Sequence, residues 1–305
     1  MADKTILAIL DPTNLGEQPV IERAAWLAQN SSAALELYIC DYDADIDSGH
    51  VSTVWIRQPD AQKNLVSIHR DRLEAIAEPL RARGLSVSVD VGWDHPLGEA
   101  LVRKIIARKP SLVAKDTHHH NVLKRTVLSN TDWHLIRGCP APLLLVKPHA
   151  IGSRPKVFAA IDPLHAHDKP RQLDDSIFHH AQWLAEATGG ELNVVHSFRV
   201  PLELEVPPDV AEQIEQQHRE AMAEFLEAHA VLESCAHLLD GRPEQCLPEI
   251  TESEDAAFIV MGAVSRRGLD KLFLGSTAER TLDRLPCDLL IVKPEGFEPS
   301  LPHSH

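Results

Sequence analysis

The segments ILAILDPTN (residues 6–14) and VFAAIDPLH (residues 157–165) are two versions of one sequence, an apolar run of strand length that ends in Asp-Pro. Two further pairs follow in the same order, AAWLAQNSSAALELYIC (24–40) with AQWLAEATGGELNVVHS (181–197) and PAPLLLVKP (140–148) with PCDLLIVKP (286–294). The repeat period of roughly 150 residues is the size of a whole domain. We therefore expect two copies of one fold.

The alternation of strands and helices indicates the fold class. In the first copy, hydrophobic periodicity predicts strands at residues 4–10, 34–41, 85–91, 111–115 and 142–147 and helices at 17–30, 60–83, 97–108 and 131–138. In the second copy it predicts strands at 156–161, 190–197, 235–240, 256–261 and 288–292 and helices at 170–188, 209–232, 243–253 and 277–285. Such alternation is typical of an α/β protein, here with two tandem five-stranded, mainly parallel sheets and helices on both faces.

The helix predicted at residues 60–83 carries the clearest periodicity. Its apolar side chains recur at steps of three to five and form one stripe among charged residues: Leu65, Ile68, Leu73, Ile76 and Leu80. Gly84 follows directly and is expected to end the helix.

The segment HAIGSRPK (149–156) contains Gly, Ser and Pro and reads as a short linker. It separates a first domain at residues 1–149 from a second at 155–296. Each domain ends in a compact apolar strand, at 143–146 and at 289–292. If these strands lie at sheet edges, we expect them to pair with each other and to form an internal pseudo-dimer.

The overall charge argues against some partners. The 305 residues include 45 acidic and 30 basic side chains, which gives a formal net charge of -15. Duplex nucleic acid is therefore not an expected partner, because phosphate binding depends on clustered Lys and Arg. No apolar stretch approaches the roughly 20 residues of a membrane span, and no cleavage pattern follows the N-terminal apolar run. We expect a cytoplasmic protein, with further homodimerisation left open.

The cysteines and histidines give no sign of a metal site. The five cysteines are scattered and lack CxxC spacing, so we expect reduced thiols and neither disulfides nor structural zinc. Among 18 histidines the clusters are His118 to His120 and the terminal HSH. Neither has the helical spacing or the carboxylate of a familiar catalytic metal site, so no metal is expected.

The most specific local pattern is MGAVSRRGLDKLFLGSTAER, residues 261–280. Gly262 follows a predicted strand, Arg266 and Arg267 lie in a loop, and Gly275 precedes a predicted helix. Ser276 and Glu279 have the S-x-x-E spacing of a capping box. A helix N-terminus beside glycines and arginines favours an anion such as phosphate, at the edge where open α/β sheets place ligands.

A plainer interpretation is equally open at this stage. The glycines can simply turn the chain, and the capping box can simply begin a helix. This interpretation gains weight because the chain has neither a GxxxxGK[ST] P-loop nor a GxGxxG after its first strand.

The same segment, with the repeat, resembles the universal stress protein family, whose nucleotide-binding members carry Gly, two residues, Gly, nine residues, Gly and then Ser or Thr. The resemblance covers essentially both halves, and the KDTHHH loop and TDWHL helix resemble the tandem members in particular. It implies an adenine-nucleotide alpha-hydrolase-like fold that binds ATP or a related adenine nucleotide. The residues it implies are Asp162 at the adenine, Ser197 at the ribose or base, and Gly262, Ser265, Gly275, Ser276 and Thr277 at the phosphates. The arginines of the loop, Arg266 among them, are expected to add cationic donors to this site.

One position departs from the family pattern, because Ser265 stands where the second glycine is expected. If this residue needs positive φ, a side chain costs about 1–2 kcal/mol. That cost weakens a site about tenfold, unless the Ser265 hydroxyl replaces the lost contact. Both outcomes stay open.

The first copy lacks the pattern. An offset of 146 places Lys115, Asp116, His119, Ser129 and Asn130 opposite Met261, Gly262, Ser265, Gly275 and Ser276. All three glycine positions carry side chains, and Asp116 would repel phosphate. We therefore expect no nucleoside triphosphate in the first domain, although Asp11 matches Asp162.

Three functions follow as hypotheses. The leading one is a stress-associated binding module with its nucleotide in the second domain and no catalytic residues. The second is an enzyme such as a slow ATPase. Asp270 and Lys271 are then the nearest acid and base to the phosphate cradle, meaning the predicted anion site at the glycines, the arginines and the helix start of residues 262–277. The third is a nucleotide-independent scaffold or carrier of an amphipathic small molecule, suggested by the predicted helix 209–232 with Met222, Phe225 and Leu226.

Overall fold

The computed structural model describes residues 4–47, 60–117, 128–164, 171–200, 207–263 and 281–299. These residues divide into two compact units, with the boundary between Val146 and Lys147. No helix within these ranges is long and apolar enough to cross a bilayer.

The first unit alternates strands and helices as predicted, with one additional short helix, α2. Its elements are β1 (Thr5–Leu10), α1 (Pro19–Ser31), β2 (Ala34–Asp41), α2 (Ala44–Asp47), α3 (Ala61–Ala82), β3 (Val87–Trp93), α4 (Leu97–Arg108), β4 (Leu112–Asp116), α5 (Asn130–Gly138) and β5 (Leu143–Val146). The strands pair in the order β3-β2-β1-β4-β5, and each described pair is parallel.

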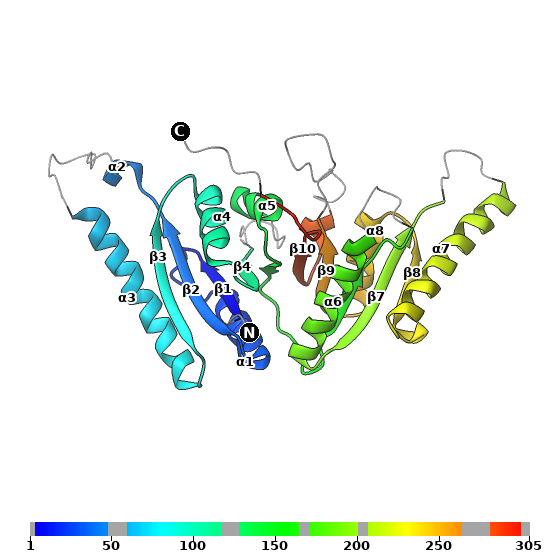
Figure 1. Cartoon of the computed structure of the whole chain (residues 1–305), viewed down its shortest axis with the longest axis horizontal. Helices are drawn as coiled ribbons and strands as arrows, with labels where there is room; N and C mark the ends of the chain where they lie inside the picture. Colours follow the sequence, from blue (N-terminus) through cyan, green and yellow to red (C-terminus); the bar gives the residue numbers. More distant parts are fainter. Residues whose placement is uncertain are drawn as a thin grey trace. The chain divides into compact units, whose positions relative to one another are not determined.

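The second unit repeats this arrangement. Its elements are β6 (Lys156–Ala160), α6 (Arg171–Thr188), β7 (Glu191–Phe198), α7 (Pro208–Ala228), the 3₁₀ turn η1 (Glu233–Cys235), β8 (Ala236–Asp240), α8 (Pro243–Ser253), β9 (Ala256–Gly262) and β10 (Asp288–Val292). The strand order is β10-β9-β6-β7-β8, again with parallel pairs. Figure 1 shows α3 beside β3 in the first unit and α7 beside β8 in the second. The predicted α/β class is confirmed.

The strand order determines which face each helix covers. In the first unit, α1 and α3 lead outward from β1 to β3, whereas α4 and α5 lead in the opposite direction. Right-handed crossovers therefore place these two pairs of helices on opposite faces of the sheet. The central strand β1 is consequently buried on both sides, and residues 6–10 are at most 4% exposed.

The buried face of helix α3 differs from the predicted apolar stripe. Ile68 is 61% exposed, and the buried face instead contains His69, Leu73, Ala77 and Leu80. His69 is buried because its Nε2 lies 2.8 Å from Asp41 Oδ2 at the end of β2. A specific polar partner, which periodicity does not reveal, has replaced an apolar contact.

Two predicted helices end differently from expectation. The helix predicted at 209–232 ends at Ala228, because Ala230 adopts a left-handed conformation with φ 54°. Residues 281–284 are helical, whereas the rest of the helix predicted at 277–285 lies mostly outside the described residues. The expected pairing of the two final strands stays a prediction.

Candidate functional site

The carboxyl ends of the second unit's strands meet at one edge of its sheet, because the strand pairs are parallel and β6 lies between β7 and β9. Asp162 follows β6, Ser197 lies near the end of β7, and Gly262 ends β9. The structure therefore brings these three predicted site residues to the same edge. This is the edge where open α/β sheets bind ligands.

The other predicted site residues cannot be placed in the same way. Ser265, Arg266, Gly275, Ser276 and Thr277 lie outside the described residues. Their contribution to a phosphate cradle stays a prediction.

Asp162 is held in place through its backbone. It is 9% exposed, and its N-H donates to Asp174 Oδ1 in the first turn of α6 at 3.1 Å. The first unit has a matching device, in which Asp11 N-H donates to Gln18 Oε1 at 2.8 Å just before α1. In both units the loop after the first strand is thus fixed to the helix that follows it.

A pair of histidines that sequence reasoning missed lies beside Asp162. His196 Nδ1 is 3.1 Å from the Ile161 carbonyl, and His196 Nε2 is 2.8 Å from His218 Nδ1. Because a carbonyl only accepts, a neutral His196 donates from Nδ1 and accepts at Nε2 from His218. Phe198 stacks on His218 with ring centroids 4.8 Å apart.

The environment of His218 keeps it neutral. Burial lowers the pKa of His218, and the nearby Asp162 carboxylate only partly opposes this effect. One signal for His218 was visible in the sequence, namely a histidine on the inward side of a mainly charged helix. Because the Nδ1-H of neutral His218 donates to His196, its Nε2 is left to accept a hydrogen bond from a ligand without carrying charge.

Ser197 belongs to the other face of the sheet. Successive strand side chains alternate between faces, so Ser197 points away from the side on which His196 and Phe198 meet α7. It is half-buried. In the first unit the repeat places Cys40 at this position, and Cys40 lines a pocket there.

The structure gives Gly262 a packing role. A Cβ added at this residue would lie 2.7 Å from Leu173 Cδ2 and 2.9 Å from Leu173 Cγ. The glycine therefore allows α6 to approach β9 closely. In the first unit Asp116 stands at this position, and its carboxylate accepts from Val20 N-H at the start of α1, at 2.7 Å. Helix packing is therefore sufficient to explain Gly262, and this glycine does not by itself indicate a ligand.

The corresponding cradle of the first unit is filled by its own side chains. Asp132, which is fully buried, accepts from Lys115 Nζ at 2.7 Å through Oδ1. Its Oδ2 accepts from the N-H and hydroxyl of Ser129 at 2.7 and 2.8 Å, which completes a capping box at the start of α5. A carboxylate of the chain itself thus occupies the helix N-terminus. The Ser129-x-x-Asp132 spacing was the sequence signal for it.

The profile of the universal stress protein family matches residues 3–147 and 164–293, which is most of the chain and both units. The chain belongs to the universal stress protein family. The two matches confirm the predicted tandem architecture.

Universal stress proteins E from two bacteria align with this chain almost from end to end. The protein from Salmonella typhi is 28% identical over 97% of this chain and 96% of its own length. The protein from Escherichia coli K12 is 27% identical over 97% of this chain and 95% of its own length.

Solved structures share the fold of this chain. A functionally unknown protein from Pseudomonas aeruginosa PAO1 is 27% identical and superimposes with a TM-score of 0.77, covering 96% of this chain and 94% of that chain. A universal stress protein from Archaeoglobus fulgidus is 17% identical and shares the fold, with a TM-score of 0.67 over 96% of this chain and 99% of that chain.

Proposed function

We propose that this universal stress protein binds ATP or a related adenine nucleotide in its second half, residues 155–296, and that its first half, residues 1–149, acts as a scaffold. The observation that carries the proposal is the difference between the two cradles. The first is filled by the Lys115–Asp132 pair. At the matching positions the second half has Met261 and Ala278, neither of which carries charge.

The filled cradle disfavours phosphate for an electrostatic reason. The backbone and hydroxyl donors of Ser129 already bind the Asp132 carboxylate, and so does the Lys115 ammonium. A phosphate there would find its donors taken and would lie beside a buried negative charge. Repulsion between like charges is strong where water is excluded.

The second half supports the proposal through its own residues. Asp162, Ser197 and Gly262 share one sheet edge. The family resemblance assigns the phosphates to Gly262, Ser265, Gly275, Ser276 and Thr277, and Arg266 in the same segment supplies a cation. His218 adds a neutral acceptor, Nε2, beside Asp162. These residues favour binding over turnover, so we propose a non-catalytic or weakly hydrolytic module.

Titration calorimetry with ATP on the full chain tests this proposal. We expect one nucleotide per chain. Two equivalent sites would contradict the difference between the halves, and no binding would contradict the nucleotide function itself. A colorimetric phosphate-release assay on the same samples measures turnover, which we expect to be slow or absent.

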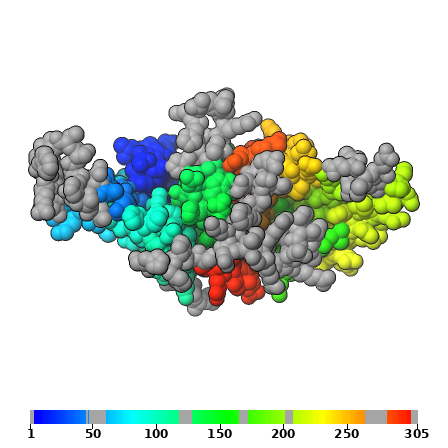
Figure 2. Space-filling model, turned by 90° about the horizontal axis from the view of Figure 1, so that it is seen from above, coloured from blue at the N-terminus to red at the C-terminus, as the bar shows by residue number. Residues whose placement is uncertain are grey.

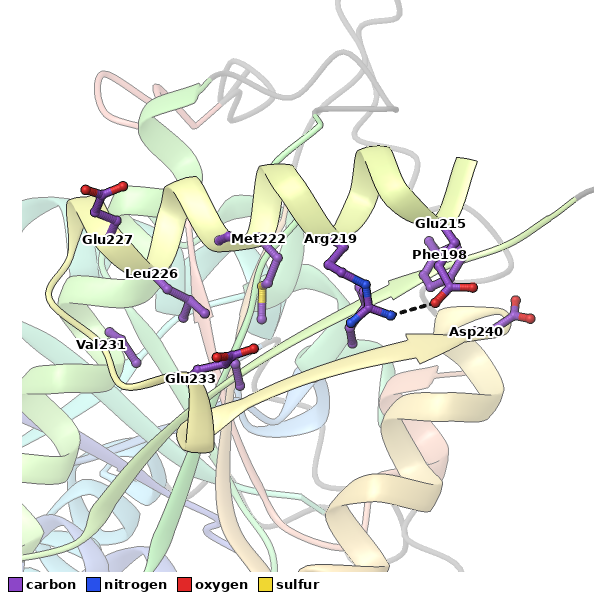
Figure 3. Close-up of a pocket in the computed structure, with 12 residues that line it drawn as sticks. Phe198, Glu215, Arg219, Met222, Leu226, Glu227, Val231, Glu233 and Asp240 are labelled. Carbon is purple, nitrogen blue, oxygen red and sulfur yellow. Dashed lines mark hydrogen bonds and ion pairs between the residues drawn. The ribbon is translucent and has the colours of Figure 1, made fainter. Parts of the chain in front are cut away.

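A second candidate function has a specific observation in its favour. A pocket of about 600 Å³ lies between α7 and β8 (Figure 3). Met222 and Leu226 point from α7 toward β8, whereas Glu233 and the ion-paired Arg219 supply polar groups. α7 lies at the surface of the second unit (Figure 2). Such a lining suits an amphipathic small molecule, as the carrier hypothesis requires.

Ligand analysis separates the two candidates. Purified protein is denatured, and its released small molecules are identified by mass spectrometry. A retained nucleotide that is lost in Gly275→Asp supports the first function. A retained amphipathic molecule that is lost in Met222→Trp, which fills the pocket, supports the second.

A further inference from the structure

The first unit contains a pocket of about 370 Å³ at the carboxyl edge of its sheet, where β1 and β2 end and α5 begins. Its apolar lining includes Leu10, Leu97 and Leu101. Small-molecule sites usually have volumes of roughly 300–1,000 Å³ and a mainly apolar lining with a few polar groups. The pocket is therefore large enough for a small organic ligand.

The lysine at one end of this pocket is already bound by other groups of the chain and does not favour an anion. Lys115 lines it, but its ammonium group is bound to Asp132 Oδ1 at 2.7 Å and to the Asp116 carbonyl at 2.9 Å. Among the lining residues that the structure describes, Lys115 is the only lysine or arginine. No cationic side chain of the described lining is thus left to hold an anion.

Three carboxylates lie in the lining, Asp11, Asp41 and Asp94, and of these Asp94 is ion-paired with Arg103 at 2.8 Å. The negative charge of these carboxylates affects the neighbouring Cys40 thiol. The pKa of the Cys40 thiol is raised, mainly because the thiol is buried, and the charges of Asp94 and Asp41 act in the same direction. The pocket is therefore electrostatically suited to a cation.

The Asp41 carboxylate can accept a further donor. Asp41 Oδ2 faces His69 Nε2 at 2.8 Å, and Asp41 Oδ1 accepts from the Tyr42 N-H at 2.8 Å. Each carboxylate oxygen has two lone pairs, so these partners leave half of the capacity of Asp41. The Asp41 side chain is 26% exposed and hence within reach of a ligand.

An aromatic pair forms part of the lining. The rings of Tyr42 and His95 meet edge to face with centroids 4.1 Å apart. An aromatic ring contacts both apolar bodies and organic cations favourably.

We propose that this pocket binds a small organic amine, with the protonated amino group on the Asp41 carboxylate and an aromatic or alkyl body against Leu97, Leu101 and Tyr42. The site lies in the half to which the nucleotide function assigns no ligand, and it takes the opposite charge. The two proposals therefore stand or fall separately.

Titration calorimetry on the full chain tests the site with two probes of equal shape and opposite charge, phenethylamine and hydrocinnamate. We expect the amine to bind and the acid not to bind. Asp41→Asn should weaken amine binding by about tenfold or more, because a charge-assisted hydrogen bond is lost. Asp90→Asn is the matched control, since Asp90 lies outside the lining and should leave the affinity within about twofold.

Several results would overturn the proposed amine site. Binding of hydrocinnamate as tight as that of phenethylamine, or no binding of the amine, overturns the proposal. If Asp41→Asn unfolds because His69 loses its partner, the double variant Asp41→Asn, His69→Gln takes its place, and unchanged affinity in that variant also overturns the proposal. Saturating ATP should leave amine binding intact, because displacement would place the amine in the nucleotide site.

Discussion

Lys115 Nζ lies 2.7 Å from Asp132 Oδ1, and this buried pair stands where the second half of the chain has Met261 and Ala278. One copy of the duplicated fold contains an internal ion pair at a place where the other copy has uncharged residues. The two copies thus differ in chemistry while keeping one backbone plan.

The first prediction concerns this pair. Asp132→Ala leaves the Lys115 ammonium buried without its partner and should lower the free energy of unfolding by about 3–5 kcal/mol, measured by urea denaturation. Inorganic phosphate should raise the melting temperature of this variant more than that of the wild type, because the freed donors accept an anion. The double variant Lys115→Met, Asp132→Leu is the control and should lose much less stability. Equal losses in both variants would contradict a role for the charge.

The second prediction tests whether the segment around Gly275 binds phosphate or only begins a helix. Gly275→Asp places a negative side chain where the family pattern assigns phosphate, so binding of a fluorescent ATP analogue should be lost while the melting temperature changes little. Ser129→Asp at the matching position of the first half is the control and should leave binding unchanged. Unchanged affinity in Gly275→Asp would return the segment to the plainer interpretation of a helix start.

The third prediction tests the packing role of Gly262. Gly262→Ala forces its Cβ against Leu173 and should cost about 1–3 kcal/mol in the free energy of unfolding. Shortening the opposing side chain relieves the contact, so Gly262→Ala with Leu173→Ala should lose less stability than the sum of the two single variants. Strict additivity would show that the two residues do not press on each other.

The fourth prediction concerns pH. Burial lowers the pKa values of His180, His218 and His237, all in the second unit. Their pKa values in the folded protein thus lie below the ordinary 6.5, so the unfolded chain binds more protons as the pH falls through 6.5. Stability should therefore fall from pH 7.5 to 5.5 in thermal unfolding. His180→Gln should make this fall shallower, and an unchanged slope would argue against His180.

The fifth prediction concerns thiol reactivity. Cys287 is buried, and burial raises its pKa to about 12, so very little thiolate is present at neutral pH. Cys235 is half-exposed. Iodoacetamide should therefore alkylate Cys235 in the native protein long before Cys287, as read by peptide mass spectrometry. Fast labelling of Cys287 would mean that its region opens readily.

Much of the fold could be predicted because it depends on short-range patterns. The duplicated Asp-Pro strands and the periodic helices predicted the order of nearly all elements, and parallel pairing then placed Asp162, Ser197 and Gly262 at one edge. The exposed Ile68 and the buried His69 could not be predicted, because the Asp41 partner is 28 residues away in sequence.

The site was predictable to a smaller extent. The His196–His218 pair depends on the packing of α7 against β7, and the close approach of Leu173 to Gly262 depends on α6 against β9. Neither contact has a local signature. Asp132 differs, because its spacing from Ser129 was visible, but its bond to Lys115 required the position of α5 next to β4.

A carboxylate that is part of the chain cannot be diluted or exchanged. Asp132 sits at its donors at an effective concentration far above that of any free anion, so the state of the first half is independent of how much nucleotide surrounds the protein. A dose-response curve of this tandem protein should then have the slope of a single site, with a Hill coefficient of about one. With the proposed nucleotide site in the second half, the duplication would give the chain one half that responds to nucleotide and one that does not, and no cooperativity between them.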